Sequence, residues 1–195
     1  MNKILLIDGH SILNRAFYGV PPLTNFEGLH TNAVYGFINI MLKSLEDEHA
    51  DYIAVAFDLK APTFRHEMFA EYKGTRKPMP QELHEQVPVI KEVLAAMTIP
   101  VITLEGYEAD DILGTLAKRC QRDGFEVSIL SGDRDLLQLA DEHIKIRMPK
   151  TVKGQTSIEN YYPSDVIDKY QVTPEEFIDL KALMGDSSDY IPGVL

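Results

Sequence analysis

Short apolar runs alternate along the chain with longer segments in which apolar residues recur at helical spacing. Residues 4–7 (ILLI) and 53–57 (IAVAF) have the length of buried strands, whereas residues 31–46 place their apolar side chains along one helical stripe. The pattern predicts strands at about 3–8, 52–57, 101–104, 126–130 and 144–147, and a small hairpin near residues 153 and 154. It predicts a helix from Ser11 as N-cap, and helices at about 31–46, 81–97, 109–122, 134–140, 163–170 and 174–184.

This alternation of strands and helices predicts an α/β fold of three layers, in which a mainly parallel central sheet has helices on both faces. With 195 residues and 45% hydrophobic composition, the chain can bury one sizeable core, so we expect one domain over residues 1–195. The single cysteine, Cys120, fits a reducing cytoplasm. No apolar run approaches the roughly 20 residues that span a bilayer, so no membrane contact is expected.

Acidic residues follow most of the predicted strands, and two more lie in the GDSSD motif after the predicted helix 174–184. The candidates are Asp8, Asp58, Glu108, Asp110, Asp111, Asp133, Asp135, Asp186 and Asp189. Because the carboxyl ends of parallel strands meet at one edge of a sheet, we expect these side chains to converge on one crevice. So many carboxylates would repel one another unless divalent cations lay between them. A site that has carboxylate oxygens as ligands, and no thiolate or histidine beside them, favours Mg²⁺ or Mn²⁺.

Each acidic residue also has a simpler interpretation. Asp caps helices and starts turns, and acids in the first turn of a helix complement its dipole. The repetition of acids after successive strands favours metal ligation over these local roles. The net charge of −11 argues against a general nucleic-acid coat, although bound divalent cations would weaken that argument.

The stretch 60–80 concentrates basic and aromatic side chains. Lys73 and Arg76 lie three residues apart, so they could share a helix face and contact phosphates, while Phe64 or Tyr72 could stack on bases. The alternative is a solvated helix whose aromatic side chains turn to the core. Arg15, one turn beyond Asp8, could reach the same crevice or form a surface salt bridge.

Several motifs occur in a fixed order. They are LLIDGH (5–10) with Arg15, AVYGF (33–37), AFD (56–58), TFRHE (63–67), Tyr72-Lys73, EADD (108–111), GDRD (132–135) and LMGDSSD (183–189). This set resembles the 5′-nuclease (5′–3′ exonuclease) domain at the amino end of bacterial DNA polymerase I, in the flap endonuclease family. The resemblance runs from about Lys3 to Val194.

The resemblance implies a resolvase-like, PIN-like 5′-nuclease fold with a helical arch at about 60–80. It implies that the nine carboxylates surround two or more Mg²⁺ or Mn²⁺ ions. It also implies that Arg15, Arg65, Lys73 and Arg76 are basic catalytic residues near the scissile phosphate and the helical arch, and that Tyr72 is an aromatic residue there that contacts the substrate. The implied activity is metal-dependent hydrolysis of phosphodiesters at 5′ flaps, nicks or 5′ ends of DNA, and of RNA primers, in replication and repair.

Family members continue into polymerase domains and, before them, a helix–three-turn–helix element that grips duplex DNA. We therefore expect the DNA-gripping region to be incomplete from about residue 183. Tyr190 stands where the family has asparagine. Because of these departures, one alternative is that the chain is a non-catalytic remnant that binds metal or a DNA junction without cutting it. A ribonuclease of a related acidic nuclease family is the other alternative, and the long 60–80 stretch speaks against it.

Overall fold

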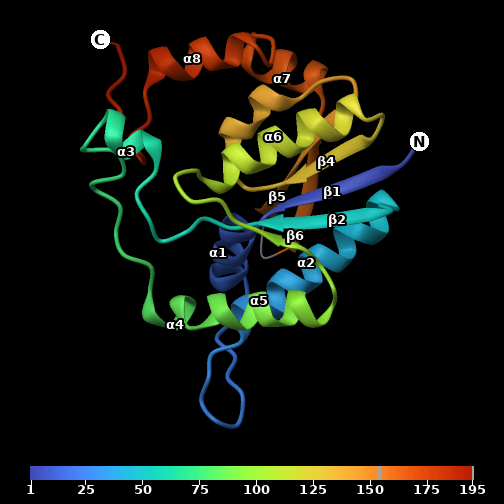
Figure 1. Ribbon diagram of the computed structural model, residues 1–195, viewed down its shortest axis with the longest axis vertical. Coiled ribbons are helices and arrows are strands. Elements are labelled where there is room, and N and C mark those ends of the chain that lie inside the picture. The colour runs from blue at the N-terminus through green and yellow to red at the C-terminus, as the bar shows by residue number, and fades with distance from the viewer. Residues whose placement is uncertain (153–154, 195) are drawn as a thin grey trace.

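In the residues that the structure describes, 1–152 and 155–194, the centre of the computed structural model is a six-stranded sheet (Figure 1). Its strand order is β3 (Val101–Ile102), β2 (Tyr52–Ala56), β1 (Lys3–Asp8), β4 (Glu126–Leu130), β5 (Ile144–Val152) and β6 (Gln155–Tyr161). The first five strands pair in parallel, and β6 pairs antiparallel with β5. The predicted mainly parallel sheet is confirmed.

Helices cover both faces of this sheet (Figure 1). One side carries α1 (Gly9–Gly19), α2 (Asn32–Glu48), α4 (Gln81–His84) and α5 (Gln86–Ala96). The other carries α6 (Ala109–Arg122), the 3₁₀ helix η1 (Arg134–Leu139), α7 (Pro163–Tyr170) and α8 (Glu176–Met184). Side chains alternate along β1, so Leu5 and Ile7 are buried against the first layer and Leu6 against the second. The sheet therefore has one apolar core on each face.

The register of the strands decides where the site lies. Asp8 at the end of β1 pairs with Ala56 at the end of β2, and Ile7 pairs with Leu130 at the end of β4. The residues that follow these three strands therefore leave the sheet at one edge, as the sequence predicts.

Some local boundaries differ from the predicted ones. Helix α1 begins at Gly9 with Asp8 as its N-cap, because the carboxylate Oδ1 of Asp8 accepts a hydrogen bond from the N–H of Ser11 at 3.0 Å. The predicted helix 81–97 is divided into α4 and α5. Pro88 lacks an N–H group, so it cannot donate the helical hydrogen bond to the carbonyl of His84.

The last two strands of the sheet, β5 and β6, are longer than predicted. Strand β5 continues to Val152 and pairs with β6, whose polar sequence gives no apolar run from which to predict it. The expected hairpin turn at residues 153 and 154 lies outside the described residues.

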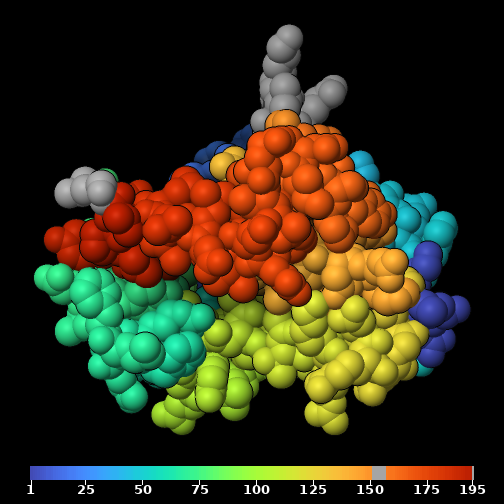
Figure 2. Space-filling model, turned by 90° about the horizontal axis from the view of Figure 1, so that it is seen from above, coloured from blue at the N-terminus to red at the C-terminus, as the bar shows by residue number. Residues whose placement is uncertain are grey.

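Between residues 60 and 80 the structure has one five-residue helix, α3 (Phe64–Met68), followed by turns. Lys73 has a left-handed backbone with φ of 58°, so it cannot share a helix face with Arg76, and that expectation was wrong. The segment lies beside the loop that follows α8 (Figures 1 and 2), and the Lys73 N–H donates to the Asp189 carbonyl at 2.9 Å. Contacts with distant residues, rather than a continuous helix, fix this segment. None of the described helices is both long enough and apolar enough to span a membrane.

Candidate active site

A cavity of about 560 Å³ opens at the carboxyl edge of the parallel strands. Its lining includes all nine predicted carboxylates, namely Asp8, Asp58, Glu108, Asp110, Asp111, Asp133, Asp135, Asp186 and Asp189. They come from the ends of β1 and β2, the start of α6, the start of η1 and the loop after α8. The predicted convergence is therefore confirmed, while the role of these residues as metal ligands stays a prediction.

The inner end of the cavity is rich in uncompensated negative charge. Asp8 is only 5% exposed, and burial raises its pKa to about 6, although its oxygens accept hydrogen bonds from the Ser11 N–H and, at 2.7 Å, from the Ser131 hydroxyl. Burial raises the pKa of Asp110 to about 8, and repulsion from neighbouring carboxylates, Asp8 and Asp133 first among them, adds to the rise. Ionisation of these two carboxyl groups is therefore unfavourable, and a bound cation would relieve that cost.

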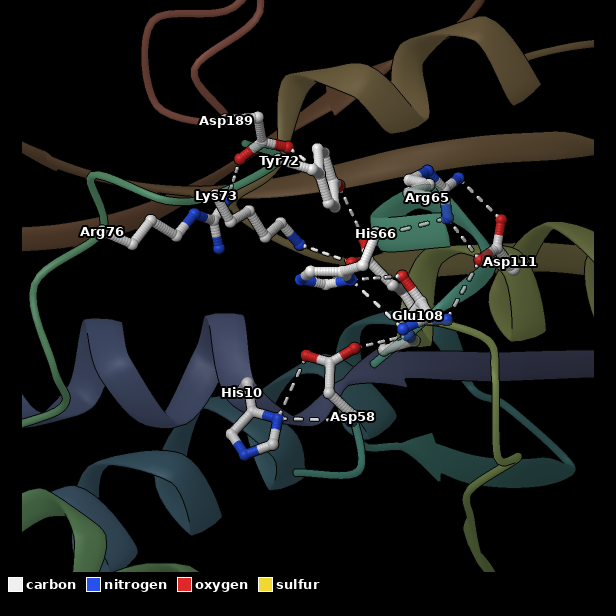
Figure 3. Close-up of polar contacts among 12 residues, drawn as sticks. His10, Asp58, Arg65, His66, Tyr72, Lys73, Arg76, Glu108, Asp111 and Asp189 are labelled. Carbon is white, nitrogen blue, oxygen red and sulfur yellow. Dashed lines mark hydrogen bonds and ion pairs between the residues drawn. The ribbon is translucent and has the colours of Figure 1, made fainter. Parts of the chain in front are cut away.

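The outer carboxylates are paired with basic side chains (Figure 3). Arg65 donates two parallel hydrogen bonds to Asp111, at 2.7 and 2.8 Å. The Lys73 Nζ lies 2.8 Å from Glu108 Oε1, and Arg76 forms an ion pair with Asp189. Burial acts to raise the pKa of the Asp111 carboxyl, but the hydrogen bonds from Arg65 and the Glu108 N–H, together with the positive charges of Arg65 and Lys73, outweigh it, and the pKa is lowered. The 60–80 segment thus supplies positive charge to this rim of the cavity.

Tyr72 occupies a different environment from the predicted one. Its side chain is 6% exposed, so its ring is not open for stacking on a base. Its hydroxyl lies 3.0 Å from Glu108 Oε2 and 3.1 Å from Asp189 Oδ2, and can donate to either carboxylate (Figure 3). Burial and these two carboxylates raise the pKa of the phenol, so it remains a donor. Tyr72 therefore positions carboxylates, which corrects its predicted role as a stacking residue.

Two other predicted residues do not line the cavity. Arg15 is half-buried on α1, and Phe64 opens α3; neither is among the described residues that surround the cavity. The Phe64 ring lies 4.5 Å below the Arg65 guanidinium carbon and packs against Tyr107, with ring centroids 5.7 Å apart. Phe64 thus orients Arg65 and remains partly exposed to solvent.

Three residues that the sequence analysis did not single out contact the carboxylates. His10 Nδ1 lies 3.3 Å from Asp58 Oδ2 (Figure 3), Ser131 donates to Asp8, and Lys181 Nζ lies 3.0 Å from both Asp135 Oδ1 and Asp186 Oδ2. His10 is the last residue of the LLIDGH motif and Ser131 directly precedes the GDRD motif, so their positions in the sequence could have indicated these contacts. Nothing in the local sequence indicates the contact of Lys181, because it arises from the packing of α8 beside η1.

The donor set suits a hard divalent cation, since it offers carboxylate oxygens from several segments, with raised pKa values at the buried Asp8 and the half-buried Asp110. As the side chains stand, no three His, Cys, Asp or Glu residues in the described chain are grouped closely enough to hold a metal ion. Several carboxylates face basic side chains instead. Cation binding at the outer positions therefore calls for small rotations that release these ion pairs.

The loop after α8 is closed by its own hydrogen bonds. The Asp186 N–H donates to the Ile191 carbonyl and the Ile191 N–H to the Asp186 carbonyl, both at 2.8 Å. Within the loop, Asp186 Oδ1 accepts from the Ser188 N–H and hydroxyl. Burial acts to raise the pKa of Asp186, but the bonds from Ser188 and Lys181 hold it at about 2. The loop presents Asp186 and Asp189 to the cavity as a fixed pair.

Tyr190 in this loop has φ of 62°, a left-handed conformation in which asparagine is better tolerated than tyrosine. Its side chain is 47% exposed, so little packing would be lost on replacement. We expect Tyr190→Asn to raise the free energy of unfolding by roughly 0.5–1 kcal/mol, measured by urea denaturation. Tyr190→Phe keeps the backbone strain and should leave stability unchanged. A loss of stability in Tyr190→Asn would contradict the strain argument.

Comparison with known proteins fits this geometry. The family model described as the 5′-3′ exonuclease N-terminal resolvase-like domain matches residues 3–171. The chain belongs to this family. DNA polymerase I of Bacillus caldotenax is 54% identical over 192 residues, which cover 98% of the chain and 22% of that protein. The chain thus spans about a fifth of the length of this DNA polymerase I.

Solved structures show the same fold. The T5 D15 protein co-crystallised with metal ions aligns with a TM-score of 0.76 at 25% identity, covering 99% of this chain and 70% of that one. The bacteriophage T5 D15 flap endonuclease in a pseudo-enzyme–product complex with DNA and metal ions aligns with a TM-score of 0.77 at 24% identity, with the same coverage. The resolvase-like 5′-3′ exonuclease fold predicted from the motifs is confirmed.

Proposed function

We propose that this chain is the catalytic domain of a divalent-metal-dependent, structure-specific 5′-nuclease. It hydrolyses phosphodiester bonds at 5′ flaps, nicks or 5′ ends of DNA, and of RNA primers paired with DNA. The observation that carries the proposal is the carboxylate cavity at the strand ends, faced by basic side chains of the 60–80 segment. Family membership supports hydrolysis from the 5′ side, and makes a ribonuclease of another acidic family the weaker alternative.

The nine carboxylates divide between two ends of the cavity. Asp8, Asp110 and Asp133 repel one another at the inner end, and Asp135, Asp186 and Asp189 lie toward the loop after α8. Two or more Mg²⁺ or Mn²⁺ ions held there would lower the pKa of a bound water and neutralise charge on the leaving oxygen. Asp58, Glu108 and Asp111 complete the set.

Arg65, Lys73 and Arg76 supply the positive charge that a phosphate needs. Each one forms an ion pair with a carboxylate of the cavity. Once those carboxylates are neutralised, the same side chains can turn to the phosphodiester and offset the negative charge that builds on it. Arg65 offers a planar pair of donors that matches two phosphate oxygens.

The 60–80 segment also supports selection of 5′ ends. It is joined to the loop after α8 by the Lys73 N–H bond to the Asp189 carbonyl and by the bond from Arg76 Nε to the Ser188 carbonyl at 3.3 Å. The two segments lie side by side (Figure 2), and both contribute side chains to the lining of the cavity, so a strand that reaches the carboxylates would contact both. A single-stranded 5′ end can make both contacts more readily than a duplex can.

This proposal is tested with matched DNA substrates in Mg²⁺ or Mn²⁺. A 5′-flap duplex and a linear single strand should yield short 5′ products, whereas a 3′-flap duplex and a circular single strand should be cut at least roughly tenfold more slowly. Equal cleavage of circular and linear strands would contradict 5′-end selection. Cleavage of circular RNA but not of DNA flaps would favour the ribonuclease alternative.

Lys73→Met separates phosphate contact from metal binding. We expect cleavage to fall on the order of a hundredfold, because one donor to the developing charge is lost. Stabilisation by Mn²⁺ should persist, since Lys73 contributes no metal ligand. Lys77→Met is the control, because Lys77 is exposed on the same segment and does not line the cavity. Normal cleavage by Lys73→Met, measured in single-turnover assays, would remove Lys73 from the mechanism.

A further inference from the structure

Lys181 bridges two carboxylates of the cavity from the outer end. It lies on α8, and its Nζ is 3.0 Å from Asp135 Oδ1 and 3.0 Å from Asp186 Oδ2. Asp135 belongs to η1, and Asp186 to the loop after α8, so the ammonium group joins two segments that are far apart in sequence. The side chain is 28% exposed, which places the ion pair in a partly desolvated position.

The oxygens that Lys181 contacts are those that a cation would need. Asp186 Oδ1 is already taken by the N–H and hydroxyl of Ser188, which leaves Oδ2 directed at Lys181. Asp135 contributes its Oδ1 to the same ammonium group. A divalent cation between Asp135 and Asp186 would meet these two oxygens, and the ammonium group could not remain beside it because like charges repel.

We propose that Lys181 is a built-in counter-ion, which holds Asp135 and Asp186 together in the metal-free protein and competes with the divalent cation that binds between them. Cation binding at this end of the cavity requires the ammonium group to withdraw. An adjoining cavity of about 390 Å³, lined by Lys181 together with Ser11, Arg134 and Gly132, gives the side chain room to move. The inference rests on the metal site of the proposed function and assigns this residue a role in it.

This arrangement predicts that the two cation sites differ in affinity. At the inner end, Asp8 accepts its hydrogen bonds from uncharged donors, the Ser11 N–H and the Ser131 hydroxyl. At the outer end Lys181 already compensates Asp135 and Asp186. The first cation should therefore bind at the inner end, and the second should bind more weakly because it must displace Lys181.

A purely structural ion pair gives a different result when its lysine is replaced. Lys181→Met would then lower the stability of the protein and leave cation affinity unchanged or weaker. If Lys181 is a competitor, Lys181→Met lowers the stability of the metal-free protein but tightens binding of the second cation. The two readouts move in opposite directions, which distinguishes competition from simple support of the loop.

The test is calorimetric titration of the full chain with Mn²⁺, without DNA. We expect Lys181→Met and Lys181→Gln to bind the second Mn²⁺ about tenfold more tightly than the wild type, which corresponds to about 1.4 kcal/mol. Lys181→Arg keeps the charge and should stay within about threefold of the wild type. Lys118→Met is the matched control, because Lys118 pairs with Asp141 at 2.6 Å, and neither residue lines the carboxylate cavity.

Unchanged or weaker second-site binding in both Lys181→Met and Lys181→Gln would overturn the inference and leave the proposed function standing. Tighter binding in Lys181→Arg would also overturn it, because charge would then not be the cause. A wild-type chain that binds no Mn²⁺ would instead refute the proposed metal site itself, and the inference with it. Circular dichroism of each variant establishes that the titrated protein is folded.

Discussion

Asp110→Asn is expected to abolish metal-dependent cleavage while raising the stability of the metal-free protein. The amide cannot supply an anionic metal ligand, so cleavage should fall by three orders of magnitude or more, roughly the loss seen when catalytic groups are removed. The same change removes a half-buried charge that lies among Asp8, Asp133, Asp58 and Glu108. Activity and stability should therefore change in opposite directions.

The stability effect has a defined pH dependence. The pKa of Asp110 is raised from 3.8 to about 8, so the folded protein binds this proton more tightly than the unfolded chain does. The metal-free protein should consequently lose stability as pH rises from about 4 to about 8. In Asp110→Asn this loss disappears, which should give a gain on the order of 5 kcal/mol at pH 8 and almost none at pH 4.

Asp58→Asn is the matched control, because it alters another carboxylate of the same cavity. Burial acts to raise the pKa of Asp58, but hydrogen bonds from His10 and the Ala109 N–H outweigh it, and the pKa is lowered. Asp58→Asn should therefore destabilise the metal-free protein at pH 8. Both variants are compared by urea denaturation in EDTA at pH 4 and 8. A destabilised Asp110→Asn at pH 8 would mean that this carboxylate is not under like-charge repulsion.

Divalent cations are expected to stabilise the chain strongly. A cation that binds only the folded protein adds about 2.7 kcal/mol at a hundredfold excess over its dissociation constant. Mn²⁺ or Mg²⁺ should accordingly raise the melting temperature by several degrees, in line with roughly 2–4 °C per kcal/mol for a chain of this size. EDTA should reverse the rise, and KCl at equal ionic strength should not reproduce it. An unchanged melting temperature in millimolar Mn²⁺ would argue against a shared cation site.

The position of the site was predictable because it depends on short sequence patterns. These patterns define the strands, and the parallel register of the strands then brings their last residues close together. Apolar runs before Asp8 and Asp58 predict strands, and parallel pairing then brings both residues to one edge. The strands form where the local sequence predicts them, so the nine predicted carboxylates all line the cavity. Family motifs added the identity of the fold, which periodicity alone could not supply.

The features that sequence reasoning missed depend on contacts between distant segments. Tyr72 is buried because Glu108 and Asp189 approach its hydroxyl from two sides, although its neighbours suggested an exposed aromatic ring. Lys181 reaches Asp135 only after α8 packs beside η1. The predicted hairpin near residues 153 and 154 has its two strands in β5 and β6, but the length of β6 was not predictable, because its polar sequence carries no apolar alternation and its pairing with β5 defines it. In each case tertiary contacts outweigh local preference.

The central claim is that the carboxylate cavity, loaded with divalent cations, hydrolyses phosphodiesters at a 5′ end. Its most direct test is incubation of the chain with a 5′-labelled flap substrate in Mn²⁺, in Mg²⁺ and in EDTA, with Asp110→Asn alongside. We predict short labelled 5′ products with either metal for the wild type, and none in EDTA or with Asp110→Asn. Metal-dependent stabilisation and DNA binding without any cleavage would contradict the claim and identify the chain as a non-catalytic binding domain.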